Sequence, residues 1–519
     1  MSNEPFYQDS QFTQYVGDAT EVIDSLPEHS VDSIMTSPPY FGLRVYDAPV
    51  RIFDNHNNCE HEWGENIITG DNRFRGEHSI DGRNKNPEVT LHGKFRSKFC
   101  SKCGAWQGVL GSESRPGDYI HHLVQIFDSC KRILKPSGSL WVNIADTRWN
   151  AKGSCFNPGG GNTSLQNNKK EAGVFPVQRG NKSDNPNIPV KSMVGIPERF
   201  AIAMIDRGWI LRNKIIWHKN NCLPSSARDR FTDDYELLFF FTLNGKPLYW
   251  INEKTMQCVN KKPAGIHGQE NIDWKYIPCP KCTSFESQVK TADCKRCNST
   301  GVVRDSLWDS YDYYFEQQFE PMKYPERLFN PDTSEHKTTT LKDEGNRVTG
   351  GLHDGRTQYG NPALGRNMRT VWTINTRGLG KEYKHYAAFP AELCTTPILS
   401  TIPEFICSKC GLPKTKVYQK TGELIGEDGY GSRTAEVQGV SVTSSLLTKK
   451  VMEKEFSGLS TCSCSASFVP GVILDPFGGT GTTALEARRL GRRAICIDIS
   501  ESYAKMAVKR VTGIPNPFD

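Results

Sequence analysis

The chain has 519 residues, 37% of them hydrophobic, and a formal net charge of +6. This length exceeds one ordinary domain and favours a core of a few hundred residues with inserts, while the 45 glycines and 30 prolines indicate an α/β protein with long polar loops. No run approaches the roughly 20 apolar residues of a membrane span, and the first residues lack a signal-peptide pattern.

The first motif in chain order is a buried-strand pattern, VDSIMT at 31–36, that runs directly into Ser37-Pro38-Pro39-Tyr40. The two prolines remove two N–H donors and stiffen the loop, so its carbonyl oxygens are available to a ligand. Oxygens held in fixed positions can accept protons from an exocyclic amine and localise its lone pair. Ser37 Oγ and the Pro38 carbonyl suit that role, while the Tyr40 ring would stack on a flipped base. The same tetrapeptide also occurs in ordinary turns and proline-rich recognition segments.

The segment after this loop is polar and carries the first of three cysteine clusters. Cys59-x-His61 and Cys100-x2-Cys103 together supply four ligands for zinc. The same segment contains basic residues, which either contact DNA phosphates or form a solvent-exposed face; they are Arg73, Arg75, Arg83, Lys85, Lys94, Arg96 and Lys98. A glycine- and asparagine-rich stretch at 150–192 is expected to be a mobile loop.

The second cluster lies in the region 245–365. Cys279-x2-Cys282 and Cys294-x2-Cys297 are separated by a short spacer, which is typical of a four-cysteine zinc site. Next comes WDSYDYYFEQQ, where we expect the tyrosines to pack in the core of a helix rather than to stack on bases. The polar tract that begins at Ser334 is expected to fold only on DNA.

The third cluster pairs Cys407-x2-Cys410 with Cys462-x-Cys464 across about fifty residues. Complete four-ligand sets leave no open coordination position, so we expect two or three structural zinc ions that hold polar inserts together. The six other cysteines are expected to be ordinary, mostly buried residues. A cytosine-C5 methyltransferase needs a thiolate nucleophile, usually in a Pro-Cys dipeptide. The only such dipeptide here contains Cys279, which belongs to the second cluster, so the sequence argues against a C5 enzyme.

The last motif is a strand, a glycine turn, a helix and a second strand. VILD at 472–475 leads into PFGGTG, a helix is expected from Thr482 to Leu490, and the next strand ends near Asp498. This order is a nucleotide-binding half of a doubly wound sheet, in which the acid accepts hydrogen bonds from ribose hydroxyls. Its glycines also fit a dinucleotide fingerprint, but the chain has no second mononucleotide-binding half downstream.

TSPPY near one end and DPFGGTGTT near the other resemble the beta class of DNA amino-methyltransferases, in which the catalytic motif precedes the cofactor motif. Ordered similarities, from YVGDATEV to HYAAFPAELC, extend over some 300 residues. The resemblance implies S-adenosylmethionine as cofactor and assigns its binding to Asp18, Phe389, Pro390, Asp475, Pro476, Phe477, Gly478, Gly479, Gly481, Thr482 and Asp498.

We therefore expect an α/β, Rossmann-like methyltransferase fold in permuted order with zinc-binding inserts. The expected parts are the catalytic half at 1–43 and 119–244, an insert at 44–118, a target-recognition region at 245–365, an entry to the cofactor half at 366–406, an insert at 407–466 and the cofactor half at 467–519. We expect a cytoplasmic protein of a prokaryote or phage that acts on double-stranded DNA.

Serine before Pro-Pro-Tyr favours N4 of cytosine as the target, with N6 of adenine as the alternative. An RNA or protein methyltransferase is a more remote rival. A non-enzymatic zinc-ribbon DNA-binding protein is the rival from another class, and it predicts a degraded cofactor loop, whereas Asp475 to Thr483 is intact.

Overall fold

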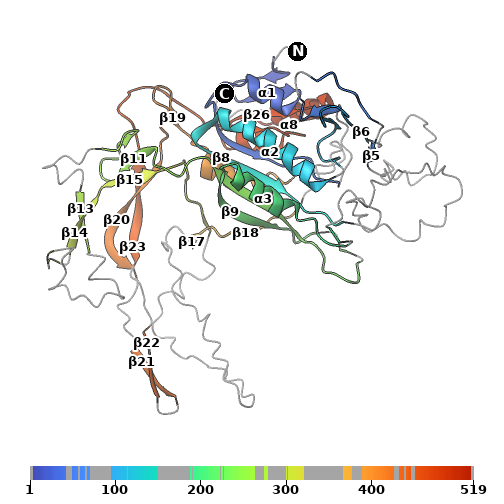
Figure 1. Ribbon diagram of the computed structural model, residues 1–519. Coiled ribbons are helices and arrows are strands. Elements are labelled where there is room, and N and C mark those ends of the chain that lie inside the picture. The colour runs from blue at the N-terminus through green and yellow to red at the C-terminus, as the bar shows by residue number, and fades with distance from the viewer. Residues whose placement is uncertain are drawn as a thin grey trace.

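The computed structural model (Figure 1) describes residues 4–42, 49–55, 59–64, 67–69, 95–113, 115–149, 188–189, 191–222, 224–225, 227–263, 274–278, 298, 300, 302–320, 366–376, 389–425, 432–437, 440–445 and 451–515. No helix among these residues is long and apolar enough to cross a membrane.

The core is a nine-stranded sheet in the order β1-β2-β26-β25-β3-β8-β10-β9-β18. Its strands are β1 (Tyr7–Gln8), β2 (Phe12–Val16), β3 (Val31–Thr36), β8 (Leu134–Ile144), β9 (Ile210–His218), β10 (Tyr235–Thr242), β18 (Val371–Thr373), β25 (Val472–Asp475) and β26 (Arg493–Asp498). Strands β2, β26, β25, β3 and β8 run parallel to one another, whereas β1 pairs antiparallel with β2, and β10 pairs antiparallel with both β8 and β9. The sheet therefore joins the two ends of the chain at its centre, as the permuted motif order predicts.

Helices cover both faces of this sheet. Consecutive strand residues point to opposite faces, so in β25 Leu474 belongs to one hydrophobic cluster and Ile473 to the other. The cluster with Leu474 includes side chains of α1 (Ala19–Ser25), α2 (Pro116–Ile133) and α3 (Ile196–Asp206). The other cluster includes side chains of α6 (Glu392–Thr401), α7 (Thr482–Arg489) and α8 (Glu501–Thr512). This two-faced arrangement confirms the predicted Rossmann-like α/β fold.

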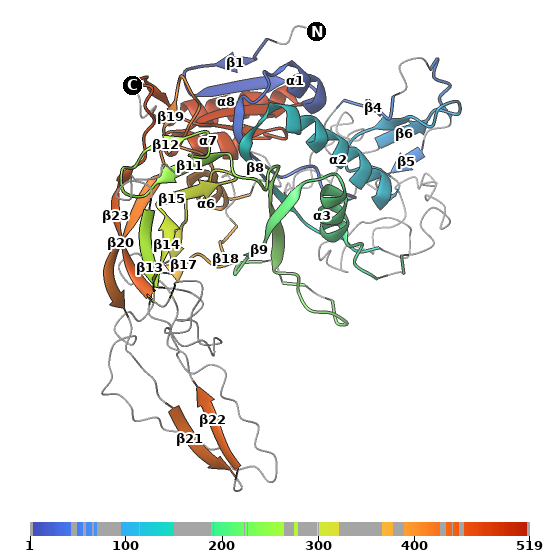
Figure 2. The same cartoon turned by 60° about the vertical axis from the view of Figure 1, so that its left-hand side comes forward.

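The inserts form small sheets outside this core. One four-stranded sheet has the order β4-β7-β6-β5 and consists of β4 (Arg51–Phe53), β5 (Ile67–Thr69), β6 (Phe95–Phe99) and β7 (Trp106–Gly108). The other small sheets are β11 (Tyr249–Asn252) with β12 (Cys258–Val259) and β15 (Trp308–Tyr311), β13 (Trp274–Pro278) with β14 (Val302–Ser306), β16 (Phe319–Glu320) with β17 (Arg366–Asn367), β19 (Ile406–Cys407) with β24 (Phe468–Val469), β20 (Lys416–Ile425) with β23 (Val451–Leu459), and β21 (Ser432–Val437) with β22 (Val440–Ser445). Figure 2 shows the β20–β23 ribbon extending away from the core, with β21 and β22 beyond it.

Two inserts that the sequence presents separately share one small core. Tyr249, Ile251 and Cys258 of the earlier region pack with Val417 of the later one. A bridge between Gln257 and Thr461 joins the same two segments. The described parts of 245–320 and 407–466 are thus joined through this small core.

The predicted helix around the tyrosines is wrong, although the predicted core packing is right. Residues 308–311 form strand β15, which pairs with β11 and stacks Tyr311 on Tyr249 with ring centroids 5.1 Å apart. Tyr314 is only 2% exposed, and Tyr313 packs edge-on against Phe240. Pairing with an apolar partner strand decides the conformation of this short aromatic stretch.

Candidate active site

The predicted catalytic and cofactor motifs meet at one edge of the central sheet. The strands β2, β26, β25 and β3 are neighbours and run parallel, so their carboxyl ends lie together. The loops after these ends line one cavity. In an open α/β sheet this edge is where ligands bind.

Twelve of the fifteen residues predicted for catalysis and cofactor binding line the cavity; they are Asp18, Ser37, Pro38, Pro39, Tyr40, Phe389, Pro476, Phe477, Gly478, Gly479, Thr482 and Asp498. Pro390, Asp475 and Gly481 are not among its lining residues. The lining also contains residues that the sequence did not single out, among them Arg51 and Phe53 of β4 and Tyr503 of α8.

Asp498 lies at the end of β26 and faces the glycine loop. Its carboxylate accepts hydrogen bonds from the backbone N–H of Gly479 at 2.7 Å and of Ser500 at 2.8 Å. Burial raises the pKa of Asp498 to about 6, although both hydrogen bonds oppose that shift. The carboxylate is thereby fixed at the cavity wall and titrates near neutral pH.

Asp475 braces the two halves of the sheet. One carboxylate oxygen accepts from Thr36 Oγ1 at 2.6 Å, and the other accepts from Thr483 Oγ1 at 2.7 Å. The side chain is fully buried, and this burial raises its pKa to about 6. Because Thr36 immediately precedes the Ser37 loop, Asp475 ties that loop to the start of α7.

The glycines of the loop have different roles. Gly481 has φ +74°, and a Cβ there would lie 2.9 Å from the Ala507 Cβ of α8. A Cβ at Gly478 would lie 2.9 Å from the Cys496 Cβ of β26. Gly481 therefore permits the turn and the close approach of α8, while Gly478 lets the loop lie against β26 at the cavity wall.

The Ser37-Pro38-Pro39-Tyr40 loop is held by hydrogen bonds. The Tyr40 hydroxyl lies 2.7 Å from Glu236 Oε2 and 2.9 Å from Asn143 Oδ1, and it accepts from Ser37 Oγ at 3.1 Å. The Tyr119 hydroxyl donates to the Pro39 carbonyl at 2.8 Å. These contacts fix the tyrosine ring and the serine oxygen in the cavity wall.

The sequence motifs do not identify Glu236 and Asn143 as partners of Tyr40. Asn143 is 1% exposed near the end of β8, within the otherwise apolar run 140–144, and Glu236 lies at the start of the apolar strand β10. Glu236 also forms an ion pair with Lys219. A polar residue inside a strand that is otherwise apolar was the available signal, because a buried polar group needs a partner.

Asp18 has two structural tasks at the cavity. It caps α1 by accepting from the Thr20 and Glu21 N–H groups, and it forms an ion pair with Arg51 at 2.8 Å. Burial raises the pKa of Asp18, and the Arg51 charge opposes that shift. Asp18 thus connects the core to the β4 insert.

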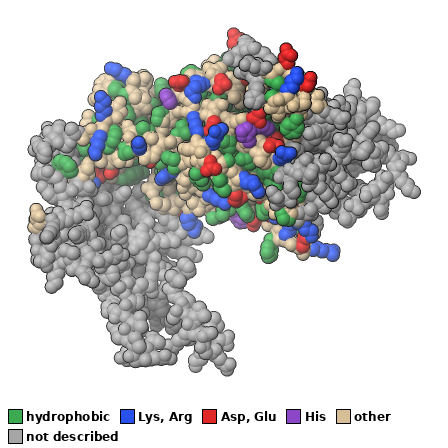
Figure 3. Space-filling view, viewed as in Figure 1, with side chains coloured by type: hydrophobic (Ala, Val, Ile, Leu, Met, Phe, Trp, Pro, Cys, Tyr) green, Lys and Arg blue, Asp and Glu red, His purple; other side chains and the backbone are tan. Residues whose placement is uncertain are grey.

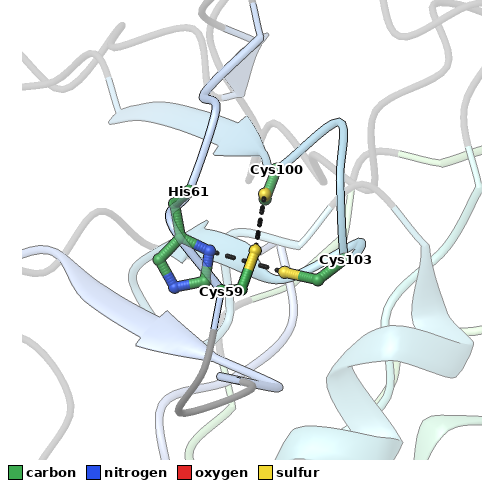
Figure 4. Close-up of side chains that lie close together, drawn as sticks. All are labelled: Cys59, His61, Cys100 and Cys103. Atoms are coloured by element: carbon green, nitrogen blue, oxygen red, sulfur yellow. Dashed lines mark hydrogen bonds between the residues drawn. The ribbon is translucent and has the colours of Figure 1, made fainter.

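Two of the three predicted metal clusters lie within the described residues, and in each the potential ligand atoms lie within 4.8 Å of one another. One consists of Cys59, His61, Cys100 and Cys103 (Figure 4), and the other of Cys407, Cys410, Cys462 and Cys464. The predicted cluster of Cys279, Cys282, Cys294 and Cys297 lies outside the described residues.

The donor geometry of the first cluster fits zinc. Two sulfurs bound tetrahedrally about 2.3 Å from one zinc ion lie about 3.8 Å apart. The Sγ atoms of Cys59 and Cys100 are 3.8 Å apart, and Cys103 Sγ lies 3.4 Å from His61 Nδ1. The other ring nitrogen of His61 lies 2.9 Å from Asn55 Oδ1, which orients the imidazole in the way that ligating histidines are oriented.

A doubly wound sheet with a glycine loop, a buried acid after the next strand and an oxygen-rich loop beside them defines an enzyme that acts through a nucleotide-like cofactor. The chain matches the N6_N4_Mtase family, described as DNA methylase, over residues 31–405 and 463–509. It belongs to this family and is a DNA amino-methyltransferase. Two alternatives raised by the sequence are thereby excluded: a non-enzymatic zinc-ribbon DNA-binding protein and a dinucleotide-dependent enzyme.

Two relatives illustrate the range of similarity. The type II methyltransferase M.Cfr9I of Citrobacter freundii is 29% identical over 270 residues, covering 49% of this chain and 67% of the relative. The type II methyltransferase M.SfiI of Streptomyces fimbriatus is 22% identical over 530 residues, covering 95% and 89% of the two chains. The solved PvuII DNA methyltransferase, described as cytosine-N4-specific, aligns with 99% of this chain and 90% of its own at 13% identity and a TM-score of 0.39.

Proposed function

We propose that this enzyme transfers a methyl group from S-adenosylmethionine to the N4 amine of a cytosine flipped out of double-stranded DNA, as the modification enzyme of a restriction-modification system. One observation carries the proposal: the Ser37 loop and the glycine loop, from opposite ends of the chain, line one cavity. The donor and the acceptor amine can then be held side by side.

The cofactor half of the cavity suits a nucleoside with an amino-acid tail. Asp498 is placed to accept hydrogen bonds from ribose hydroxyls, and the backbone at Gly478 and Gly479 allows close approach. Phe389 and Phe477 offer apolar surface in the same wall. This set matches the polar ribose and the apolar faces of S-adenosylmethionine.

The catalytic half suits an exocyclic amine. In the structure Ser37 Oγ donates to the Tyr40 hydroxyl. The lone pairs of the Ser37 oxygen can therefore accept an N–H from an incoming amine, and together with the Pro38 carbonyl oxygen they localise the amine's lone pair on its nitrogen. S-adenosylmethionine bound beside this amine would supply the methyl group: the nitrogen would bond to the methyl carbon as the carbon–sulfur bond breaks, the electron pair of that bond would pass to sulfur, and one amine proton would pass to solvent water.

The proposal for cytosine N4 rests on Ser37 at the first position of the tetrapeptide. The test is to incubate the purified chain with S-adenosylmethionine and unmethylated DNA, digest the DNA and identify the nucleosides by mass spectrometry. N4-methylcytosine supports the proposal, N6-methyladenine transfers the same mechanism to the alternative base, and methylation of neither base overturns it.

The proposed DNA contacts lie in the inserts. Figure 3 shows Lys and Arg interspersed with acidic and apolar side chains on the described part of one face. Among the predicted phosphate-tracking residues, Arg96 and Lys98 lie on β6 and the others lie outside the described residues. We assign the positive charge that neutralises the DNA backbone to the basic residues of the insert at 44–118.

Structural zinc belongs to the same proposal. The two described clusters consist of thiols and, in one case, an imidazole, which is the donor set of closed tetrahedral zinc sites. Zinc in such a site crosslinks two segments and takes no part in methyl transfer. We extend the proposal to the cluster at 279–297 on its cysteine spacing.

A further inference from the structure

One wall of the cofactor cavity comes from the insert that carries the Cys59 cluster. Arg51 and Phe53 of β4 line the cavity. The same segment continues through Asn55 to Cys59 and His61. The metal ligands and the cavity wall are therefore successive parts of one short stretch of chain.

The second pair of ligands holds the partner strand of β4. Cys100 and Cys103 form the turn between β6 and β7, where the Cys100 N–H donates to the Ala105 carbonyl. Strand β7 pairs with β4, and Phe53 lies opposite Trp106. A metal ion at the cluster would thus join the segment after β4 to the turn before β7 and clamp this strand pair from outside.

This strand pair is too small to be rigid alone. Strands β4 and β7 have three residues each. They belong to a four-stranded sheet of short strands, and small polar inserts commonly owe their order to a metal or a disulfide. The described cysteines are free thiols, so a metal is the available crosslink.

Two side chains of β4 link the position of this strand to the shape of the cavity. Arg51 bonds both to Asp18 Oδ2 at 2.8 Å and to Thr20 Oγ1 at 3.1 Å, which locates the start of α1. Phe53 stacks on the buried His122 ring of α2 with centroids 4.4 Å apart. Displacement of β4 would release the Asp18 carboxylate and open the wall that Phe53 forms.

We propose that metal at Cys59, His61, Cys100 and Cys103 controls the affinity of the cavity for S-adenosylmethionine, with Arg51 as a positioning residue that holds Asp18. This inference rests on the proposed cofactor site. It assigns the first metal cluster an effect on the reaction, whereas the cluster at 407–464 lies in an insert that contributes no residue to the described cavity lining.

The primary experiment compares two cysteine variants with the intact chain. Cys103→Ser and Cys462→Ser each remove one ligand from one cluster, and zinc content and cofactor affinity are measured by elemental analysis and calorimetry. Both variants are expected to lose about one zinc. Only Cys103→Ser is expected to weaken S-adenosylmethionine binding, by about 5- to 150-fold. Equal affinity of Cys103→Ser and the intact chain overturns the inference.

Two further measurements keep the test independent of unfolding. Arg51→Gln retains all four ligands, so it is expected to keep its zinc and still bind the cofactor more weakly. Thermodynamic linkage also requires that the cofactor tighten zinc binding by the factor by which zinc tightens cofactor binding. Release of zinc to a colorimetric chelator is therefore expected to need more chelator when S-adenosylmethionine is present, in the intact chain and in Cys462→Ser.

Different results would contradict the proposed function and the proposed coupling between metal and cofactor. An intact, zinc-loaded chain that does not bind S-adenosylmethionine contradicts the proposed function itself. A chain that binds the cofactor, but with the same affinity in Arg51→Gln and with no effect on zinc release, retains the proposed function and loses the coupling.

Discussion

At the scale of single residues, the predicted site residues separate into those that face the cavity and those that hold it in shape. Asp498 faces the cavity, whereas Asp475 uses both oxygens on Thr36 and Thr483. The sequence places both acids at strand ends, but it does not show which one lines the cavity. That distinction depends on threonines brought together by the fold.

The titration of Asp498 predicts a pH dependence of cofactor affinity. Its pKa in the folded protein is raised to about 6 by burial, so the carboxylate is ionised above that pH and protonated below it. Ribose hydroxyls donate to the ionised form, so affinity is expected to fall as the pH drops through about 6, by up to about tenfold per pH unit. Calorimetry across this range measures the effect.

Asp498→Asn is the matched control, because it keeps the shape and removes the charge. It is expected to bind S-adenosylmethionine weakly at neutral pH and to lose most of the pH dependence, and what remains is assigned to Asp475, whose pKa is also raised to about 6. An unchanged affinity in Asp498→Asn would remove this acid from the cofactor site.

Two substitutions at Tyr40 can separate the effect of its ring on turnover from the effect of its hydroxyl. Tyr40→Ala removes the base-stacking surface, worth about 1 to 3 kcal/mol by analogy with other base–aromatic contacts, so turnover is expected to fall strongly. Tyr40→Phe keeps the ring but loses the contacts with Glu236 and Asn143, and an intermediate rate is expected. Tritium transfer to DNA at saturating cofactor gives both rates, and a Tyr40→Ala variant with full turnover would reduce the loop to a structural turn.

At the scale of elements, long periodic or motif-bearing segments were predictable and short contextual ones were not. The strand at 472–475 has the predicted boundaries, and the helix begins at the predicted Thr482 and ends at Arg489, one residue before the predicted Leu490, because an apolar run and a glycine turn define these elements locally. The residues of strand β15 were predicted to be helical. That prediction failed because their conformation depends on pairing with β11, about sixty residues earlier in the sequence. The shared core of the two later inserts depends on similar distant contacts.

The metal clusters give a prediction at this scale. Elemental analysis of the purified chain is expected to find about two or three zinc ions, one for each complete ligand set. Cys222→Ser alters a half-buried thiol outside the clusters and is expected to leave the zinc content unchanged. A zinc content below one per chain would show that the cysteine spacings misled the interpretation.

At the scale of the whole molecule, motif order predicted the assembly of the core from both ends of the chain. Ser37 and Asp498 are recognisable within their own segments, so their meeting at one sheet edge followed from the resemblance to a permuted family. Arg51 was not predictable in this way, because nothing in the local sequence of the short strand β4 indicates that its first residue forms an ion pair with Asp18.

The placement of β3 between β8 and β25 has a consequence for how the protein is made. All six residues of β3 are buried, and the N–H of Val472 reaches the Asp32 carboxylate across 440 residues of sequence. Until the last strands emerge from the ribosome, β3 therefore presents an unpaired apolar edge, which is a template for association between chains. A chain truncated before residue 467 is expected to accumulate as aggregates, whereas coexpression of residues 467–519 as a separate peptide is expected to return part of it to the soluble fraction, as measured by sedimentation of cell lysates.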